Sequence, residues 1–192
     1  MIADRRNVLS LLFAGLASPA AAQTLSMKGS AMSPVTAYAF SFAGLKGDSI
    51  RLSDYAGKPV MVVNTASLCG YTPQYTGLEQ LYTRYHAHGL ALIGVPSNDF
   101  GGQEPGGADE ISETANKEYG VTFPLTAKAD VIGPKAHPFY KWAAAERPRD
   151  LPKWNFHKYL VGRDGHIAAV FASAVEPLDE QVISAIGREL DG

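Results

Sequence analysis

Two apolar runs separated by an amphipathic segment dominate the middle of the chain. Val60–Val63 and Leu90–Val95 are continuous apolar runs, which is typical of strands buried on both faces. Between them, Pro73–His88 carries leucine and tyrosine side chains at helical spacing, and Gly89 follows as a helix-ending glycine. This strand–helix–strand order predicts a pair of parallel strands joined by a right-handed crossover.

Shorter alternating segments flank this unit and predict two hairpins. Thr36–Phe42 alternates as a half-exposed strand does, and a glycine-containing turn leads from it to a second strand at Ser49–Leu52. Phe156–Val161 and His166–Phe171 flank Asp164-Gly165, a strong hairpin signal. We therefore expect antiparallel strands to join the parallel pair.

The remaining periodic segments predict helices. They are Asp109–Glu118, His137–Ala145 and a closing helix whose apolar face is made of Leu178, Val182, Ile183, Ile186 and Leu190. The chain is predicted to be an α/β protein with a central mixed β-sheet flanked by helices, an N-terminal β-hairpin and no internal repeat.

The first residues differ in pattern from the rest. Arg5-Arg6 precede the short apolar run Val8–Ala17, and Ala20–Ala22 supply small residues before Gln23. This layout predicts a signal peptide over residues 1–22, either of the twin-arginine type or an ordinary secretory one. Export would place the protein in the periplasm of a Gram-negative bacterium. The apolar run is shorter than the roughly 20 residues of a spanning helix, so no transmembrane segment is expected.

After a polar, flexible leader over residues 23–34, one domain is expected over residues 35–192. Its composition is that of a globular protein, with 46% hydrophobic and 19% charged residues. The formal charge of −2, without a basic run, gives no reason to expect a nucleic-acid partner. His86 and His88 would diverge on a helix, so neither a metal site nor a cofactor is predicted.

The chain contains one cysteine, Cys69, which lies between the first buried strand and the helix expected to begin near Thr72 or Pro73. A single cysteine excludes a disulfide framework. It is either an inert core residue or a thiol kept for its reactivity. The free N–H groups and the dipole at a helix N-terminus favour an anion, and a thiolate there would attack a peroxide oxygen to give a sulfenic acid. Because Thr72 stands where a C-x-x-C motif would have its second cysteine, an outside thiol would have to resolve that acid.

Three motifs carry a family resemblance. They are the segments 64–72 (Asn-Thr-Ala-Ser-Leu-Cys-Gly-Tyr-Thr), 96–106 (Pro-Ser-Asn-Asp-Phe-Gly-Gly-Gln-Glu-Pro-Gly) and 154–161 (Trp-Asn-Phe-His-Lys-Tyr-Leu-Val). In order and spacing they resemble the three motifs of the glutathione peroxidases, and the likeness runs from about Phe40 to about Leu190. The resemblance implies a thioredoxin-like fold and a catalytic tetrad of Cys69 as nucleophile with Gln103, Trp154 and Asn155. These three partners are neutral donors that can hydrogen-bond a thiolate and a leaving oxygen.

The departures from the family pattern bear on the reductant. Asn116 stands where members that resemble peroxiredoxins have a resolving cysteine. Ser97 stands at another common cysteine position of the family, and Asp99 stands where glutamine is usual. The absence of both cysteines favours reduction by a small thiol such as glutathione over an internal disulfide cycle. A thioredoxin-like protein is the other candidate reductant. Three basic residues precede Trp154, namely Arg147, Arg149 and Lys153. They are candidate substrate contacts, or they form a basic loop that is exposed to solvent. The short stretch from His137 to Trp154, compared with tetrameric relatives, implies a monomer.

The leading prediction is a thiol-dependent peroxidase that reduces hydrogen peroxide and organic or lipid hydroperoxides through a Cys69 sulfenic acid. One alternative is a peroxide sensor or redox relay that passes oxidation to a partner protein, which the missing resolving cysteine favours. Another is a non-enzymatic thioredoxin-like binding module, for which Cys69→Ser would keep all function.

Overall fold

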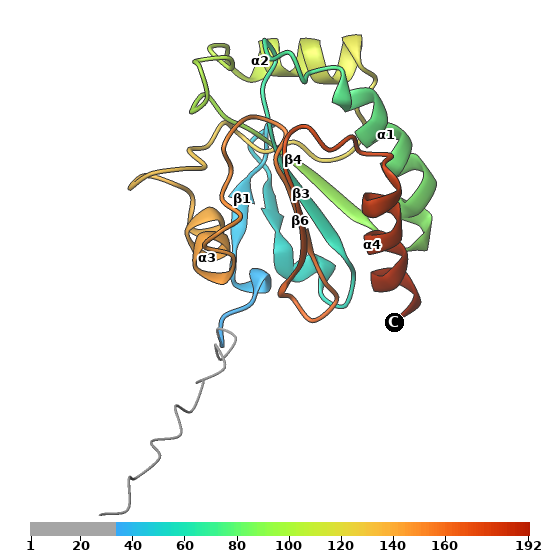
Figure 1. Cartoon of the computed structure of the whole chain (residues 1–192). Helices are drawn as coiled ribbons and strands as arrows, with labels where there is room; N and C mark the ends of the chain where they lie inside the picture. The colour runs from blue at the N-terminus through green and yellow to red at the C-terminus, as the bar shows by residue number, and fades with distance from the viewer. Residues whose placement is uncertain (1–33) are drawn as a thin grey trace, which may run out of the picture. The chain divides into compact units, whose positions relative to one another are not determined.

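The computed structural model describes residues 34–192 and shows a central four-stranded sheet in the order β4-β3-β5-β6 (Figure 1). β3 pairs parallel with β4 and antiparallel with β5, and β5 pairs antiparallel with β6. The strands are β3 (Val60–Thr65), β4 (Ala91–Pro96), β5 (Lys158–Val161) and β6 (Ile167–Phe171). The predicted parallel pair, the hairpin and the mixed sheet are therefore confirmed.

Every residue of β3 and β4 is buried, because helices cover both faces of the sheet. One face packs against α1, α2 and α4 in a core that includes Met61, Val63 and Leu160. The other face packs against α3 and the N-terminal hairpin. The helices are α1 (Gln74–Tyr85), α2 (Ala108–Ser112), α3 (Pro138–Glu146) and α4 (Glu180–Asp191).

Irregular turns continue two of these helices. The 3-10 turn η3 (His86–His88) extends α1 as far as Gly89, whose φ of 112° confirms the helix-ending role predicted for it. The π-helical turn η4 (Glu113–Glu118) continues α2, so the segment predicted as one helix consists of two different helical forms.

The N-terminal hairpin is confirmed, but its first strand is shorter than its sequence pattern predicted. β1 (Ser41–Ala43) pairs antiparallel with β2 (Ser49–Arg51), which leads into the 3-10 turn η2 (Leu52–Tyr55). The preceding residues form a 3-10 turn, η1 (Ala37–Ala39), instead of strand. Tertiary contacts override the alternation, because Ala37 is buried and donates its N–H to the Gly165 carbonyl of the β5–β6 turn.

The predicted signal peptide and nearly all of the leader lie outside the described residues. No helix within residues 34–192 is long and apolar enough to cross a membrane.

Candidate active site

Cys69 lies in the tight turn that joins β3 to α1. It is buried, with 7% of its surface exposed, and its Sγ accepts the backbone N–H of Tyr71 at 3.4 Å. The helix itself begins at Gln74, slightly later than expected. The sulfur therefore accepts a hydrogen bond from the turn that leads into α1.

Thr72, at the position of a second cysteine in a dithiol motif, holds this turn together. Its hydroxyl accepts the N–H of Cys69 at 3.1 Å and lies 2.7 Å from the Cys69 carbonyl and 2.9 Å from the Ala66 carbonyl. A threonine here therefore supplies hydrogen bonds that shape the turn, where a cysteine would supply a second thiol.

Gln103 reaches the site from the glycine-rich loop after β4. Gly101 and Gly102 both have positive φ, 68° and 64°, which bends the loop back towards the cysteine turn. The Gln103 carbonyl then accepts the N–H of Leu68 at 3.0 Å. The ammonium of Lys128 fixes the next part of the loop by donating to the carbonyls of Glu104 and Gly106 among others.

Trp154 and Asn155 arrive from the segment before β5. The Asn155 side chain is fully buried and donates from Nδ2 to Gln103 Oε1 at 2.9 Å. The Trp154 carbonyl accepts from Asn64 Nδ2 at 3.1 Å, and its ring lies beside Phe100 with the centroids 6.0 Å apart. The structure thus brings all three predicted partners into one contact network with the segment that carries Cys69.

The polar side chains of this network are neutral. The Asn155–Gln103 bond fixes the Gln103 amide so that its Nε2 donor stays available. Within the described part of the chain, neither Gln103 Nε2 nor Trp154 Nε1 has a protein acceptor. Neutral N–H donors can stabilise a thiolate and a departing oxygen anion without a salt bridge that would quench the nucleophile.

A buried carboxyl group lies directly after Gln103. Glu104 is 1% exposed, and burial raises the pKa of its carboxyl despite the opposing effects of Ser67 and Lys128. Burial also raises the pKa of the neighbouring phenol of Tyr75, on α1. The interior beneath the cysteine turn therefore disfavours negative charge on both side chains.

A cavity of about 610 Å³ adjoins Tyr71 and Trp154. Arg149 and Lys153 line it, together with the apolar Leu151 and Val170. It is therefore a surface cavity with two cations and an apolar wall beside the cysteine turn.

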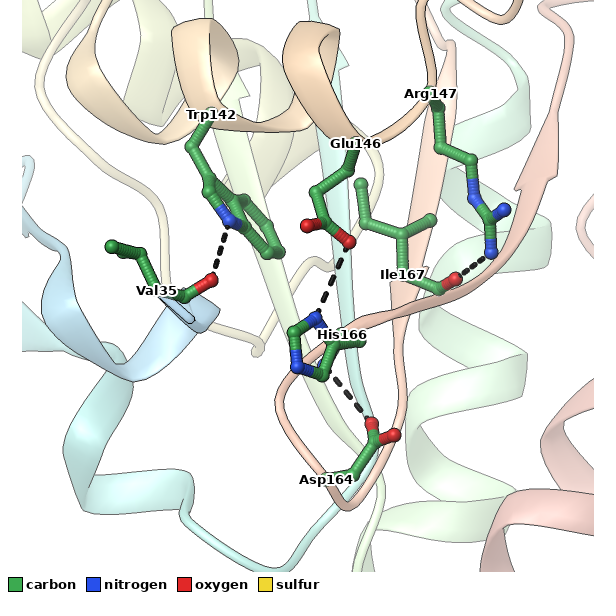
Figure 2. A network of polar contacts seen from close by, with 7 residues as sticks. All are labelled: Val35, Trp142, Glu146, Arg147, Asp164, His166 and Ile167. Carbon is green, nitrogen blue, oxygen red and sulfur yellow. Dashed lines mark hydrogen bonds and ion pairs between the residues drawn. The ribbon is translucent and has the colours of Figure 1, made fainter. Parts of the chain in front are cut away.

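Arg147, the third basic residue singled out in the sequence, lies elsewhere. Its guanidinium donates to the carbonyl of Ile167 at the start of β6, close to the Glu146–His166 pair (Figure 2). It does not line the cavity that Arg149 and Lys153 share.

The family positions that lack cysteine have structural contacts instead. Asn116 donates to the Val121 carbonyl from η4, and Ser97 is fully buried after β4. Asp99 accepts the backbone N–H groups of Val131 and Ile132 at 2.6 and 3.0 Å. It therefore anchors the segment before α3.

Sequence reasoning missed the burial of two basic residues within the third motif. His157 is 5% exposed and lines the cavity, and Lys158 is fully buried. Burial, with the Lys158 charge as the next cause, lowers the pKa of His157 to about 4. The available signal was a lysine inside an otherwise apolar strand pattern, since lysine is almost never buried without partners. Within residues 34–192 no group of three or more His, Cys, Asp or Glu side chains could hold a metal ion.

The fold and the cysteine turn define a thioredoxin-like α/β protein. A thiol:disulfide interchange protein of the thioredoxin family from Chlorobium tepidum shares this fold, with a TM-score of 0.61 at 14% identity over 83% of this chain and 99% of that one. The crystal structure of Trgpx in apo form matches with a TM-score of 0.64 at 36% identity, covering 81% of this chain and 97% of that one.

Sequence comparisons identify the family. The glutathione peroxidase family model matches residues 37–144. A hydroperoxy fatty acid reductase from Synechocystis is 45% identical over 152 residues, covering 74% of this chain and 89% of the relative. A glutathione peroxidase from Lactococcus lactis is 44% identical over 150 residues, covering 76% and 96%. The chain belongs to the glutathione peroxidase family and is a peroxidase of the oxidoreductase class.

Proposed function

We propose that this protein reduces hydrogen peroxide and organic or lipid hydroperoxides through a sulfenic acid on Cys69, with an external thiol such as glutathione completing the cycle. The observation that supports the proposal is the backbone donor on Cys69 Sγ, in a turn that Leu68 ties to the Gln103 carbonyl, together with the neutral Gln103–Asn155 pair. Cys69 is the only cysteine in the chain, so no internal thiol can resolve the oxidised sulfur.

In the first half-reaction the Cys69 thiolate attacks the terminal peroxide oxygen. The S–O bond forms as the O–O bond breaks, and the departing alkoxide or hydroxide takes a proton to leave as alcohol or water. In this proposal Gln103 Nε2 and Trp154 Nε1 donate hydrogen bonds to the sulfur or to the leaving oxygen.

In the second half-reaction one external thiol condenses with the sulfenic acid, releasing water and forming a mixed disulfide with Cys69. A second thiol then attacks that disulfide, restoring the Cys69 thiol and leaving as the oxidised disulfide. We assign Arg149 and Lys153 to the reductant or to an acidic substrate, since their cavity beside Tyr71 offers two cations to carboxylates. The relative named as a hydroperoxy fatty acid reductase supports a peroxide that combines an acyl chain with a carboxylate.

The test separates the two half-reactions. Peroxide is added to the purified protein, the sulfenic acid is trapped, and its mass is read; glutathione and thioredoxin are then supplied separately. We expect one oxidised site at Cys69, none in Cys69→Ser, and recovery of the thiol with glutathione. Arg149→Ala should slow only the recovery step, whereas the matched change at exposed Arg188 on α4 should not. Oxidation no faster than that of a free thiol would refute the proposal.

A peroxide sensor or redox relay is the second candidate, and the single cysteine favours it. In that case the sulfenic acid condenses with a thiol of a partner protein. Steady-state peroxide consumption with glutathione alone supports the peroxidase, whereas oxidation that stops after one turnover with glutathione and continues only with a protein thiol supports the relay.

We also propose that the protein is exported and acts as a monomer. The support is the sequence alone: the basic and apolar pattern of residues 1–22 and the short stretch between His137 and Trp154. Cell fractionation would test the location, and the mass of the purified protein in solution would test the oligomeric state.

A further inference from the structure

Lys158, the first residue of β5, has 0% of its surface exposed. It stands opposite Val63 of β3 in the antiparallel register. A buried ammonium is costly unless hydrogen bonds replace the water it has lost, so its partners show what retains it.

Three acceptors receive the three N–H groups of Lys158. They are Gln74 Oε1 at 2.7 Å, the Phe156 carbonyl at 2.8 Å and the Val175 carbonyl at 2.8 Å. Gln74 is the first residue of α1, Phe156 directly follows Asn155, and Val175 precedes α4. One side chain therefore ties the start of the helix after Cys69 to the segment that carries Trp154 and Asn155.

The Phe156 backbone needs such support. It is the non-glycine residue with positive φ, 64°, in the described chain, and this conformation is unfavourable for a bulky side chain. The Phe156 N–H is held by the Asn64 carbonyl at 2.6 Å, and its own carbonyl is held by Lys158. Because Phe156 follows Asn155 directly, these two bonds set the direction from which Asn155 reaches Gln103.

We infer that Lys158 is a positioning residue for the peroxidase reaction, with its protonated side chain holding the Asn155–Phe156 turn and Gln74 in the arrangement that presents the neutral donors to Cys69. The inference rests on the proposed role of Cys69 and Asn155. It requires the ammonium form, because a neutral amine has two N–H groups for three acceptors and would turn a lone pair towards one of them.

The surroundings of Lys158 bring its titration into a measurable range. Burial lowers its pKa to about 8, and Glu176 and Asp179, near the start of α4, act in the opposite direction. His157, directly before β5, is kept neutral, and α1 presents the uncharged Gln74. Gln74 Nε2 also contacts Glu176 Oε1 at 3.3 Å, so the amide bridges the buried cation and the nearest acid.

The experiment measures the rate constant of Cys69 oxidation by hydrogen peroxide against pH, using stopped-flow fluorescence. Each rate is divided by the thiolate fraction, read separately from ultraviolet absorbance, so that the Cys69 titration is removed. For the unaltered protein we expect a decline of the corrected rate constant as pH rises through about 8. For Lys158→Met we expect a corrected rate constant about tenfold lower and independent of pH over that range. Lys135→Met, which changes an exposed lysine, should behave as the unaltered protein.

Two outcomes would overturn the inference: a flat corrected profile for the unaltered protein, or the same alkaline decline in Lys158→Met. The first requires no variant, so it decides the matter even if Lys158→Met does not fold. A purely structural role would lower the melting temperature of Lys158→Met but leave the shape of its corrected profile unchanged. If the unaltered protein does not oxidise at Cys69 at all, the proposed function itself fails, which is a separate result.

Discussion

The two ends of the central sheet differ in how many of their polar groups have hydrogen-bond partners. At the end where β3 finishes, several buried polar atoms have no hydrogen-bond partner within the described chain, and Phe156 adopts a positive φ. They include the side-chain oxygens Asn64 Oδ1 and Asn155 Oδ1.

At the opposite end, around the β5–β6 turn, polar groups are paired. His166 Nδ1 lies 3.3 Å from Glu146 Oε2, and the backbone N–H of His166 donates to Asp164 Oδ1 at 2.9 Å. Arg147 and Trp142 donate to backbone carbonyls nearby (Figure 2).

Unpartnered polar groups and an unfavourable backbone conformation are thus found together at the end of the sheet that carries Cys69. Unsatisfied or strained groups lower stability and persist where a function needs them and the surrounding packing enforces them. The end that carries Cys69 has those features together with neutral donors, whereas the opposite end has the paired contacts of a supporting scaffold. The comparison can be tested at three residues.

The largest effect is expected for Gln103→Glu. The substitution keeps the shape and the oxygen that accepts from Asn155, but it replaces a donor with a negative charge near the sulfur. Because the charge disfavours the thiolate and the lost donor no longer stabilises the leaving oxygen, the rate constant for Cys69 oxidation should fall by about 100-fold or more. Gln181→Glu, an equivalent change at an exposed position of α4, is the control. A fall of less than about threefold would show that the neutral amide is dispensable.

His157→Phe should alter the pH dependence of stability. The folded pKa of His157 is about 4, below its ordinary 6.5, so its contribution to stability is present above pH 6.5 and is lost as pH falls through 4. Between these limits the unaltered protein should lose about 3 kcal/mol more free energy of unfolding than the variant does. Urea unfolding at neutral and acid pH measures this difference, and parallel pH curves for the two proteins would contradict it.

The smallest effect is expected for Glu146→Gln at the opposite end. The Glu146 and His166 side chains are only 10% and 17% exposed, but glutamine keeps an oxygen that can accept a hydrogen bond from the His166 ring, so the substitution should cost about 1 kcal/mol of unfolding free energy or less. Oxidation of Cys69 should keep its rate. A slower oxidation in this variant would remove the distinction between the two ends.

Local patterns in the sequence predicted most of the elements. The apolar runs of β3 and β4, the helix-ending Gly89 and the Asp164-Gly165 turn are short-range signals that tertiary contacts leave unchanged. The strand predicted over residues 36–42 begins only at Ser41, because Ala37 donates its N–H to the β5–β6 turn, a contact far away in the chain. The separation of Arg147 from Arg149 and Lys153 has the same origin, since residues close in sequence can face different parts of a fold.

The candidate nucleophile and its three candidate partners were identifiable from the sequence, because one cysteine and three ordered motifs can be read directly. The sequence also determined that any resolving thiol must come from outside the chain. The folded structure was needed to show that Asn155 holds Gln103, that a cavity with two cations lies beside Tyr71, and that Lys158 is buried on three acceptors. These features depend on contacts between segments that are distant in sequence. Burial at those contacts lowers the pKa values of His157 and Lys158.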